Sequence, residues 1–210
     1  YPEAFIVWNI IGLTAEQTGN LDQAIRAYKK ALSLNPNLIE TYYNLGNAFS
    51  IQNKLDEALN SYRDALSLKP DFAYAYNNMA NVLKEQGKLA EAAEAYKKVT
   101  SLMPDNAQAY MNLGNALKDQ SRHEEAMGAY NKALSIKPNY ADVYNNMGVS
   151  LQEQGKLDEA ISAFGKALFF MPENSMAHAQ ILHQKSHICD WKAIVKDHVH
   201  LESLGVVGKS

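Results

Sequence analysis

The chain has 210 residues, a formal net charge of −3, and 47% apolar against 20% charged residues, which is an ordinary composition for a soluble globular protein. This charge excludes a basic surface for nucleic acid, and no apolar run approaches the roughly 18 residues that span a membrane. The single cysteine, Cys189, cannot form an internal disulfide and fits a reducing compartment, so we expect a cytoplasmic protein.

The prolines divide the chain into equal lengths. All six are 34 residues apart: Pro2, Pro36, Pro70, Pro104, Pro138 and Pro172. A fixed period of this size predicts stacked repeats. If proline is counted as position 32, five repeats cover residues 5–38, 39–72, 73–106, 107–140 and 141–174. Residues 1–4 then read as the tail of an earlier repeat, and the initial tyrosine indicates a fragment.

Each repeat predicts two helices in succession. Apolar or small residues at positions 4, 7, 8 and 11 have helical spacing and predict helix A, and those at positions 17, 20, 24 and 27 predict helix B. The proline at position 32 should end helix B, because it lacks an amide donor and clashes with the preceding turn. Glycine or alanine at position 8 should face the alanine at position 20, while the aromatic ring at position 24 fills the space between neighbours. The predicted class is all-α.

Residue identities at fixed positions indicate a family. Position 20 is alanine in all five repeats. Position 8 is Gly12, Gly46, Ala80, Gly114 and Gly148. Position 24 is Tyr28, Tyr62, Tyr96, Tyr130 and Phe164. Over residues 5–174 the sequence resembles the tetratricopeptide repeat family. The resemblance implies a right-handed superhelical solenoid of antiparallel helix pairs that binds other proteins.

Asparagines recur on the side of helix A that should point away from helix B, along the concave face. They occupy position 6 (Asn44, Asn78, Asn112, Asn146) and position 9 (Asn47, Asn81, Asn115), and position 5 adds Tyr43, Asn77 and Asn145. A carboxamide both donates and accepts, so it can bind the backbone of an extended peptide whatever the side chains of that peptide are. The alternative is that the asparagines only bridge neighbouring helices. Position 5 carries no cation, which argues against the carboxylate clamp of chaperone-binding relatives.

Residues 175–210 read as a degenerate sixth repeat. Ser175 to His187 predicts helix A, and Asp190 should cap a helix that begins near Trp191. We expect Trp191 to cover the apolar end of repeat 5 near Phe164 and Leu168. His183 and His187 are four residues apart but make a weak metal pattern, so no metal or cofactor is expected.

A second resemblance combines the sixth repeat with the asparagines. Cys189-Asp190-Trp191 at positions 15 to 17, after a ladder of position-6 asparagines, is similar to the O-linked N-acetylglucosamine transferase family. This implies a repeat region that delivers substrates to a UDP-sugar-dependent catalytic domain lying beyond these residues. No nucleotide-sugar site or catalytic constellation occurs in the chain itself, so we expect no enzyme activity from it.

Two functions follow from these patterns. The first is a module that binds polypeptide segments of other proteins. The second is a scaffold that mediates self-association or complex formation. Phe5, Ile6 and Trp8 should form an uncovered apolar edge, and we expect association between chains through such repeat ends.

Overall fold

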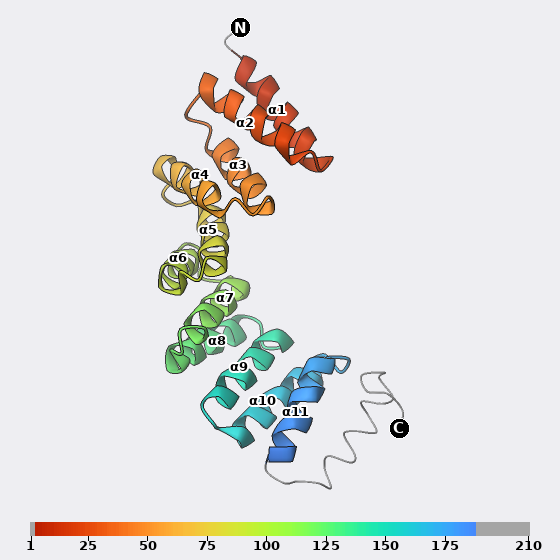
Figure 1. The fold of residues 1–210 in the computed structure, drawn as a ribbon. Helices are drawn as coiled ribbons and strands as arrows, with labels where there is room; N and C mark the ends of the chain where they lie inside the picture. The colour runs from red at the N-terminus through yellow and green to blue at the C-terminus, as the bar shows by residue number, and fades with distance from the viewer. Residues whose placement is uncertain (1–2, 188–210) are drawn as a thin grey trace. The chain divides into compact units, whose positions relative to one another are not determined.

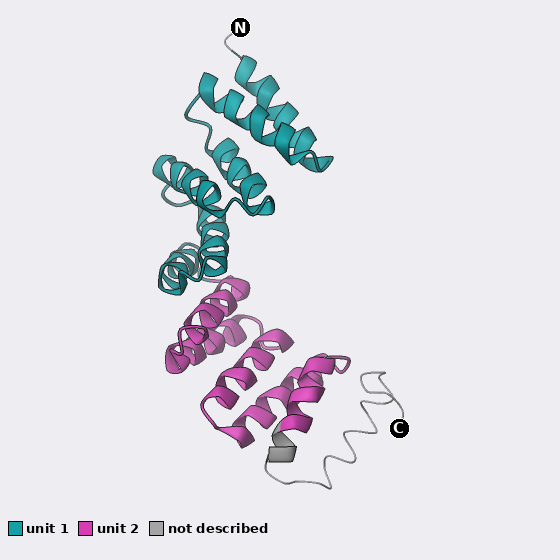
Figure 2. Cartoon of the chain, viewed as in Figure 1, with its two compact units in different colours: residues 1–104 teal, residues 105–210 magenta. Residues whose placement is uncertain are grey.

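The computed structural model describes residues 3–187. All regular structure in this range is α-helical, so the predicted all-α class is confirmed (Figure 1). The chain divides into two compact units, an N-terminal unit of residues 1–104 and a C-terminal unit of residues 105–210 (Figure 2). No helix in the described range is long and apolar enough to cross a membrane.

Within each unit, every helix packs against the next one along the chain. The N-terminal unit holds α1 (Ala4–Gln17), α2 (Leu21–Leu34), α3 (Ile39–Ile51), α4 (Leu55–Leu68), α5 (Ala73–Glu85) and α6 (Leu89–Leu102). The C-terminal unit holds α7 (Ala107–Lys118), α8 (His123–Ile136), α9 (Ala141–Glu153), α10 (Leu157–Phe170) and α11 (Ser175–His187). Odd-numbered helices are therefore the helices A of the repeats, and even-numbered helices are the helices B.

Proline sets the end of each helix B, as predicted. Helix α2 ends at Leu34 and α4 ends at Leu68, each two residues before a proline, and α6, α8 and α10 end in the same way. The residue between, such as Asn35, already has an extended backbone. Proline disfavours the helical conformation in the residue before it, so helix B stops one residue earlier still.

The turn from helix A to helix B has the same geometry in all five repeats. The residue at position 15 is left-handed in each: Gly19, Asn53, Gly87, Ser121 and Gly155, with φ between 58° and 76°. In repeat 1, the Gly19 amide donates to the Glu16 carbonyl at 3.0 Å and the Asn20 amide to the Ala15 carbonyl at 2.8 Å. These two bonds make a Schellman motif, which satisfies carbonyls at the end of helix A.

Small residues and aromatic rings form the core of each repeat. The position-20 alanines and the rings at position 24 are at most 2% exposed. The expected pairing of position 8 with position 20 stays a prediction, and the structure adds that the ring at position 24 lies directly against position 8. A Cβ on Gly46 would lie 2.5 Å from the Tyr62 ring, and one on Gly148 would lie 2.5 Å from the Phe164 ring. The absence of a side chain on the position-8 glycine therefore makes room for the aromatic ring.

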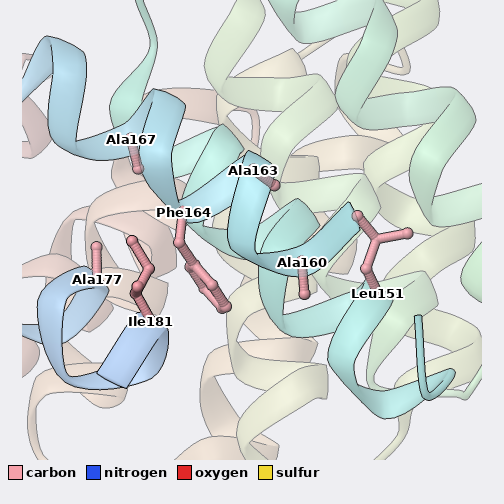
Figure 3. Close-up of a cluster of buried hydrophobic side chains, with 7 residues drawn as sticks. All are labelled: Leu151, Ala160, Ala163, Phe164, Ala167, Ala177 and Ile181. Carbon is pink, nitrogen blue, oxygen red and sulfur yellow. The ribbon is translucent and has the colours of Figure 1, made fainter. Parts of the chain in front are cut away.

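Helix α11 completes the core of the C-terminal unit. Its Ala177 and Ile181 join Phe164, Leu151 and the alanines of α10 in one buried cluster (Figure 3). The predicted cap residues Asp190 and Trp191 lie outside the described residues, so their role stays a prediction. At the other end of the range, Ile6 and Trp8 of α1 are 42% and 37% exposed, whereas Phe5 is partly buried.

Candidate functional site

The asparagines at position 9 are hydrogen-bonded to the aromatic residue at position 24 of their own repeat. The Tyr62 hydroxyl donates to Asn47 Oδ1 at 2.8 Å, and the Tyr130 hydroxyl donates to Asn115 Oδ1 at 2.8 Å. The Tyr96 hydroxyl donates to Asn81 in the same way. Each bond gives a buried hydroxyl its acceptor and ties helix A to helix B. Sequence reasoning missed this role because it treated the rings as purely apolar.

Repeats 1 and 5 have no asparagine at position 9 to accept a hydrogen bond from the residue at position 24. Repeat 1 has leucine at position 9, and the Tyr28 hydroxyl donates instead to Glu16 Oε2 at 2.6 Å. Repeat 5 has Val149 at position 9 and Phe164 at position 24, so neither side chain needs a partner. Burial raises the pKa of the hydroxyls of Tyr28, Tyr62 and Tyr130 well above the usual value. These hydroxyls therefore remain donors at neutral pH.

Asn78 at position 6 links repeat 3 to repeat 2. Its Nδ2 donates to Asn47 Oδ1 at 2.9 Å and to the Tyr43 hydroxyl at 3.0 Å. Its Oδ1 accepts from Asn77 Nδ2 at 3.2 Å. Both amide hydrogens of Asn78 are thus used inside the protein, and only its oxygen keeps a lone pair for another group. The alternative function, bridging between helices, accounts for these bonds.

The remaining predicted site residues are half-buried but are held in different ways. Asn112 Oδ1 accepts from Gln108 Nε2 at 3.0 Å in the C-terminal unit. Asn145 Oδ1 is buried and has no hydrogen-bond partner within the described residues. Asn44 and Asn146 make no side-chain hydrogen bond to any other residue whose side chain the structure describes, residues 3–183. The position-6 asparagines therefore do not share one bonding pattern, although they share one place in the repeat.

Three of the predicted residues meet in one pocket of the N-terminal unit, which we call the amide pocket. Its volume is about 360 Å³, and its lining comes from α1, α3, α4 and α5. The lining residues are Glu16, Asn47, Ser50, Ile51, Tyr62, Asn78 and Asn81. Three successive repeats thus contribute polar groups to one small space.

The amide pocket offers both donors and acceptors. Asn47 and Asn81 use their oxygens on tyrosine hydroxyls, which leaves their Nδ2 groups available as donors. Glu16 accepts a hydrogen bond on only one carboxylate oxygen, and Asn78 has a spare lone pair. Glu16 is the one charged lining residue, so the pocket is weakly acidic. Such donors and acceptors can pair with the N–H and C=O groups of a peptide backbone.

Comparison with known proteins places the chain in a family. A family model described as TPR repeat matches residues 17–50, 46–87, 80–121 and 114–155, and a tetratricopeptide repeat model matches residues 141–174. No curated protein sequence matches the chain.

Several solved structures are similar. A MamA crystal structure is 30% identical, with a TM-score of 0.78, over 84% of this chain and 96% of that one. YrrB, described as a TPR protein with an unusual peptide-binding site, is 21% identical, with a TM-score of 0.74, over 85% and 90%. A tetratricopeptide repeat protein from Parabacteroides merdae is 20% identical, with a TM-score of 0.83, over 96% and 80%.

Helix pairs follow one another along the chain, and a side-chain amide hydrogen-bonds one repeat to the next. This arrangement defines a helical-repeat module for protein–protein interaction. Among residues 3–183, whose side chains the structure describes, no group of three or more histidine, cysteine, aspartate or glutamate residues is placed to hold a metal ion. The family matches make the assignment specific, because they cover residues 17–174 without a gap. The chain belongs to the tetratricopeptide repeat family.

Proposed function

We propose that the N-terminal unit binds an extended polypeptide by its backbone and that the amide pocket is the anchoring point. The observation that supports this most directly is the set of free groups in the pocket, namely the two Nδ2 donors of Asn47 and Asn81 beside the acceptors of Glu16 and Asn78. Each backbone hydrogen bond contributes about 0.5–1.5 kcal/mol net, so affinity is the sum of several weak contacts. The peptide-binding description of YrrB points the same way.

The internal bonds determine which substitutions test this proposal. Replacing Asn81 by alanine would also remove the acceptor of the Tyr96 hydroxyl. A loss of binding could then result from a loss of stability. Asn81→Asp keeps that oxygen, replaces the Nδ2 donor with a second acceptor oxygen and adds one negative charge. Asn60→Asp is the matched control, because Asn60 is exposed on α4 and does not line the pocket.

The probe is an acetylated and amidated nine-residue peptide of alanine, serine and glutamine, which has no charge. We expect Asn81→Asp to weaken its binding several-fold in a fluorescence titration, with unchanged circular dichroism, while Asn60→Asp binds as the parent does. A peptide with methylated backbone amides should lose more affinity than one of scrambled sequence. Equal affinity for the methylated and unmethylated peptides would refute backbone recognition.

We also propose that the array is the substrate-recognition region of a glycosyltransferase similar to O-linked N-acetylglucosamine transferase. The support is the sequence resemblance, namely the position-6 asparagines together with Cys189-Asp190-Trp191. The function of the chain itself is then to hold a protein substrate while a separate domain transfers the sugar. The full-length gene decides this point. A glycosyltransferase domain encoded after Ser210 supports the proposal, and a stop codon directly after it refutes the proposal.

A further inference from the structure

A second hollow lies on the opposite side of α5 from the amide pocket. It has a volume of about 660 Å³ and lies between α4, α5 and α6, and we call it the α4–α6 groove. Leu66, Tyr76, Met79 and Leu83 form its apolar floor and are buried or partly buried. None of its lining residues is shared with the amide pocket.

The preceding repeat shows what fills the equivalent place. Position 11 is Phe49 in repeat 2 and Leu83 in repeat 3. The Phe49 ring is 5% exposed, and the Nζ of Lys29 lies 5.2 Å from the ring centroid, a cation–π contact. Arg63 has the repeat position of Lys29. It therefore belongs with Leu83, a smaller side chain than the ring that Lys29 contacts.

A small side chain of repeat 3 also lines the hollow. Position 18 is Ala90, where the other four repeats have aspartate or glutamate. Ala90 is exposed and leaves this side of the groove without a charged side chain.

The charged residues at the edge of the groove indicate which residues should flank the bound side chain in the partner. Arg63 and Lys98 line the groove and have no acidic partner among residues 3–187. Of the two rim glutamates, Glu94 is paired with Lys97 at 2.7 Å, so the uncompensated charge is mainly positive. An aromatic ring beneath cations also favours binding through its π face.

We infer that the α4–α6 groove binds an aromatic side chain of a partner protein, flanked in the partner by acidic residues. The ring packs on Leu83 and Met79, whose repeat has leucine at the position of Phe49. Arg63 and Lys98 cover the ring and pair with the flanking carboxylates. This site is separate from the amide pocket, and a backbone-bound polypeptide can occupy that pocket at the same time.

The test uses the full chain and short peptides. The probe is acetyl-Asp-Trp-Asp-amide, with acetyl-Asp-Ala-Asp-amide and acetyl-Lys-Trp-Lys-amide as comparisons. The readout is the ¹³C-labelled methyl group of Met79, which a bound indole shifts by its ring current. We expect saturable movement with the tryptophan–aspartate peptide and affinity lower by about tenfold for each comparison peptide, since aromatic anchors carry most of such binding energy.

Variants of the chain separate the groove from other surfaces. Leu83→Phe should fill the groove from within, as Phe49 does, and Ala90→Trp should fill it from an exposed lining position without changing the core. We expect each to reduce affinity by about tenfold. Arg63→Ala should reduce it several-fold, whereas Arg26→Ala, an exposed arginine of α2, should have no effect.

Three results would overturn the inference. One is a Met79 methyl that does not respond to the peptide. Another is equal binding of all three peptides, or full affinity in both filled variants. The third is movement of the Met79 methyl with protein concentration alone, which would assign the groove to a second copy of this chain.

Discussion

The pair Asn47 and Tyr62 should be exchangeable for valine and phenylalanine, but only when both residues change. Asn47→Val leaves the Tyr62 hydroxyl, in a side chain 1% exposed, without its 2.8 Å acceptor. It also removes one acceptor from Asn78. A buried unsatisfied donor costs about 1–3 kcal/mol, so we expect a loss of about 2 kcal/mol in the free energy of unfolding.

Tyr62→Phe should cost about 1 kcal/mol, because Asn47 Oδ1 keeps the amide of Asn78. In the double variant the unsatisfied hydroxyl is gone, and the pair matches Val149 and Phe164 of repeat 5. We therefore expect a double-variant loss smaller than the sum of the single losses by about 1 kcal/mol. Any helix-propensity cost of valine is the same in both backgrounds and cancels in the cycle.

Urea unfolding followed by circular dichroism measures this coupling, with the data fitted to a nearest-neighbour repeat model. The control cycle pairs Asn44→Val with Tyr62→Phe. Asn44 is on the same helix and makes no bond to the hydroxyl, so these two losses should simply add. A coupling of zero for Asn47 and Tyr62, or equal coupling in both cycles, would refute the assignment of a specific bond.

Two further predictions concern the turns and the buried hydroxyls. Ser121 has φ 59°, so Ser121→Gly should raise the free energy of unfolding by about 1 kcal/mol and Gly155→Ala should lower it by a similar amount; equal urea midpoints would contradict the strain argument. Burial raises the pKa of Tyr28, Tyr62 and Tyr130. Their stabilisation is therefore complete below the unfolded pKa of about 10 and is lost as pH rises above it. Melting temperature should stay level up to about pH 9 and then fall. Tyrosinate absorbance that reaches the full value for all 12 tyrosines near pH 10, with helicity intact, would contradict this.

The helices were predictable because several local signals agree at the same positions. The 34-residue spacing of the prolines, the apolar periodicity and the aromatic at position 24 each indicate the same helix pair. Each helix B ends where its proline requires, as at Leu34 before Pro36. Agreement between independent local preferences is what allows one sequence to specify a fold.

The sequence raised internal bridging by the asparagines as an alternative, but it did not predict which residues they bond, because the same residue type serves two purposes. Periodicity places Asn47 and Asn78 on one face of helix A, but it does not reveal that Tyr62 holds the first or that Tyr43 helps to hold the second. The sequence did contain one signal. Repeat 5, which has phenylalanine at position 24, also lacks asparagine at position 9. In repeats 2 to 4 asparagine and tyrosine occur together at these positions, which points to the bond, whereas repeat 1 has tyrosine with leucine.

The α4–α6 groove could not be predicted from the residues that the repeats share. It is lined in part by Ala90, where repeat 3 differs from the other four repeats, while the prediction was built on what the repeats share. Repeat 3 also has Ala80 where the other four repeats have glycine against the ring. Side-chain volume at a junction depends on several residues at once, so a pattern of single positions does not contain it.

The Schellman turns limit how a gene for this protein can change length. One residue inserted beside Gly19 would break the bonds to Ala15 and Glu16 and turn helix α2 by about 100° about its axis. Its alanines and tyrosine would then face solvent. Insertions of one or a few codons between the two helices should therefore be selected against. A duplication of 34 codons keeps every turn, ring and proline in register, so such genes should lengthen or shorten by whole repeats.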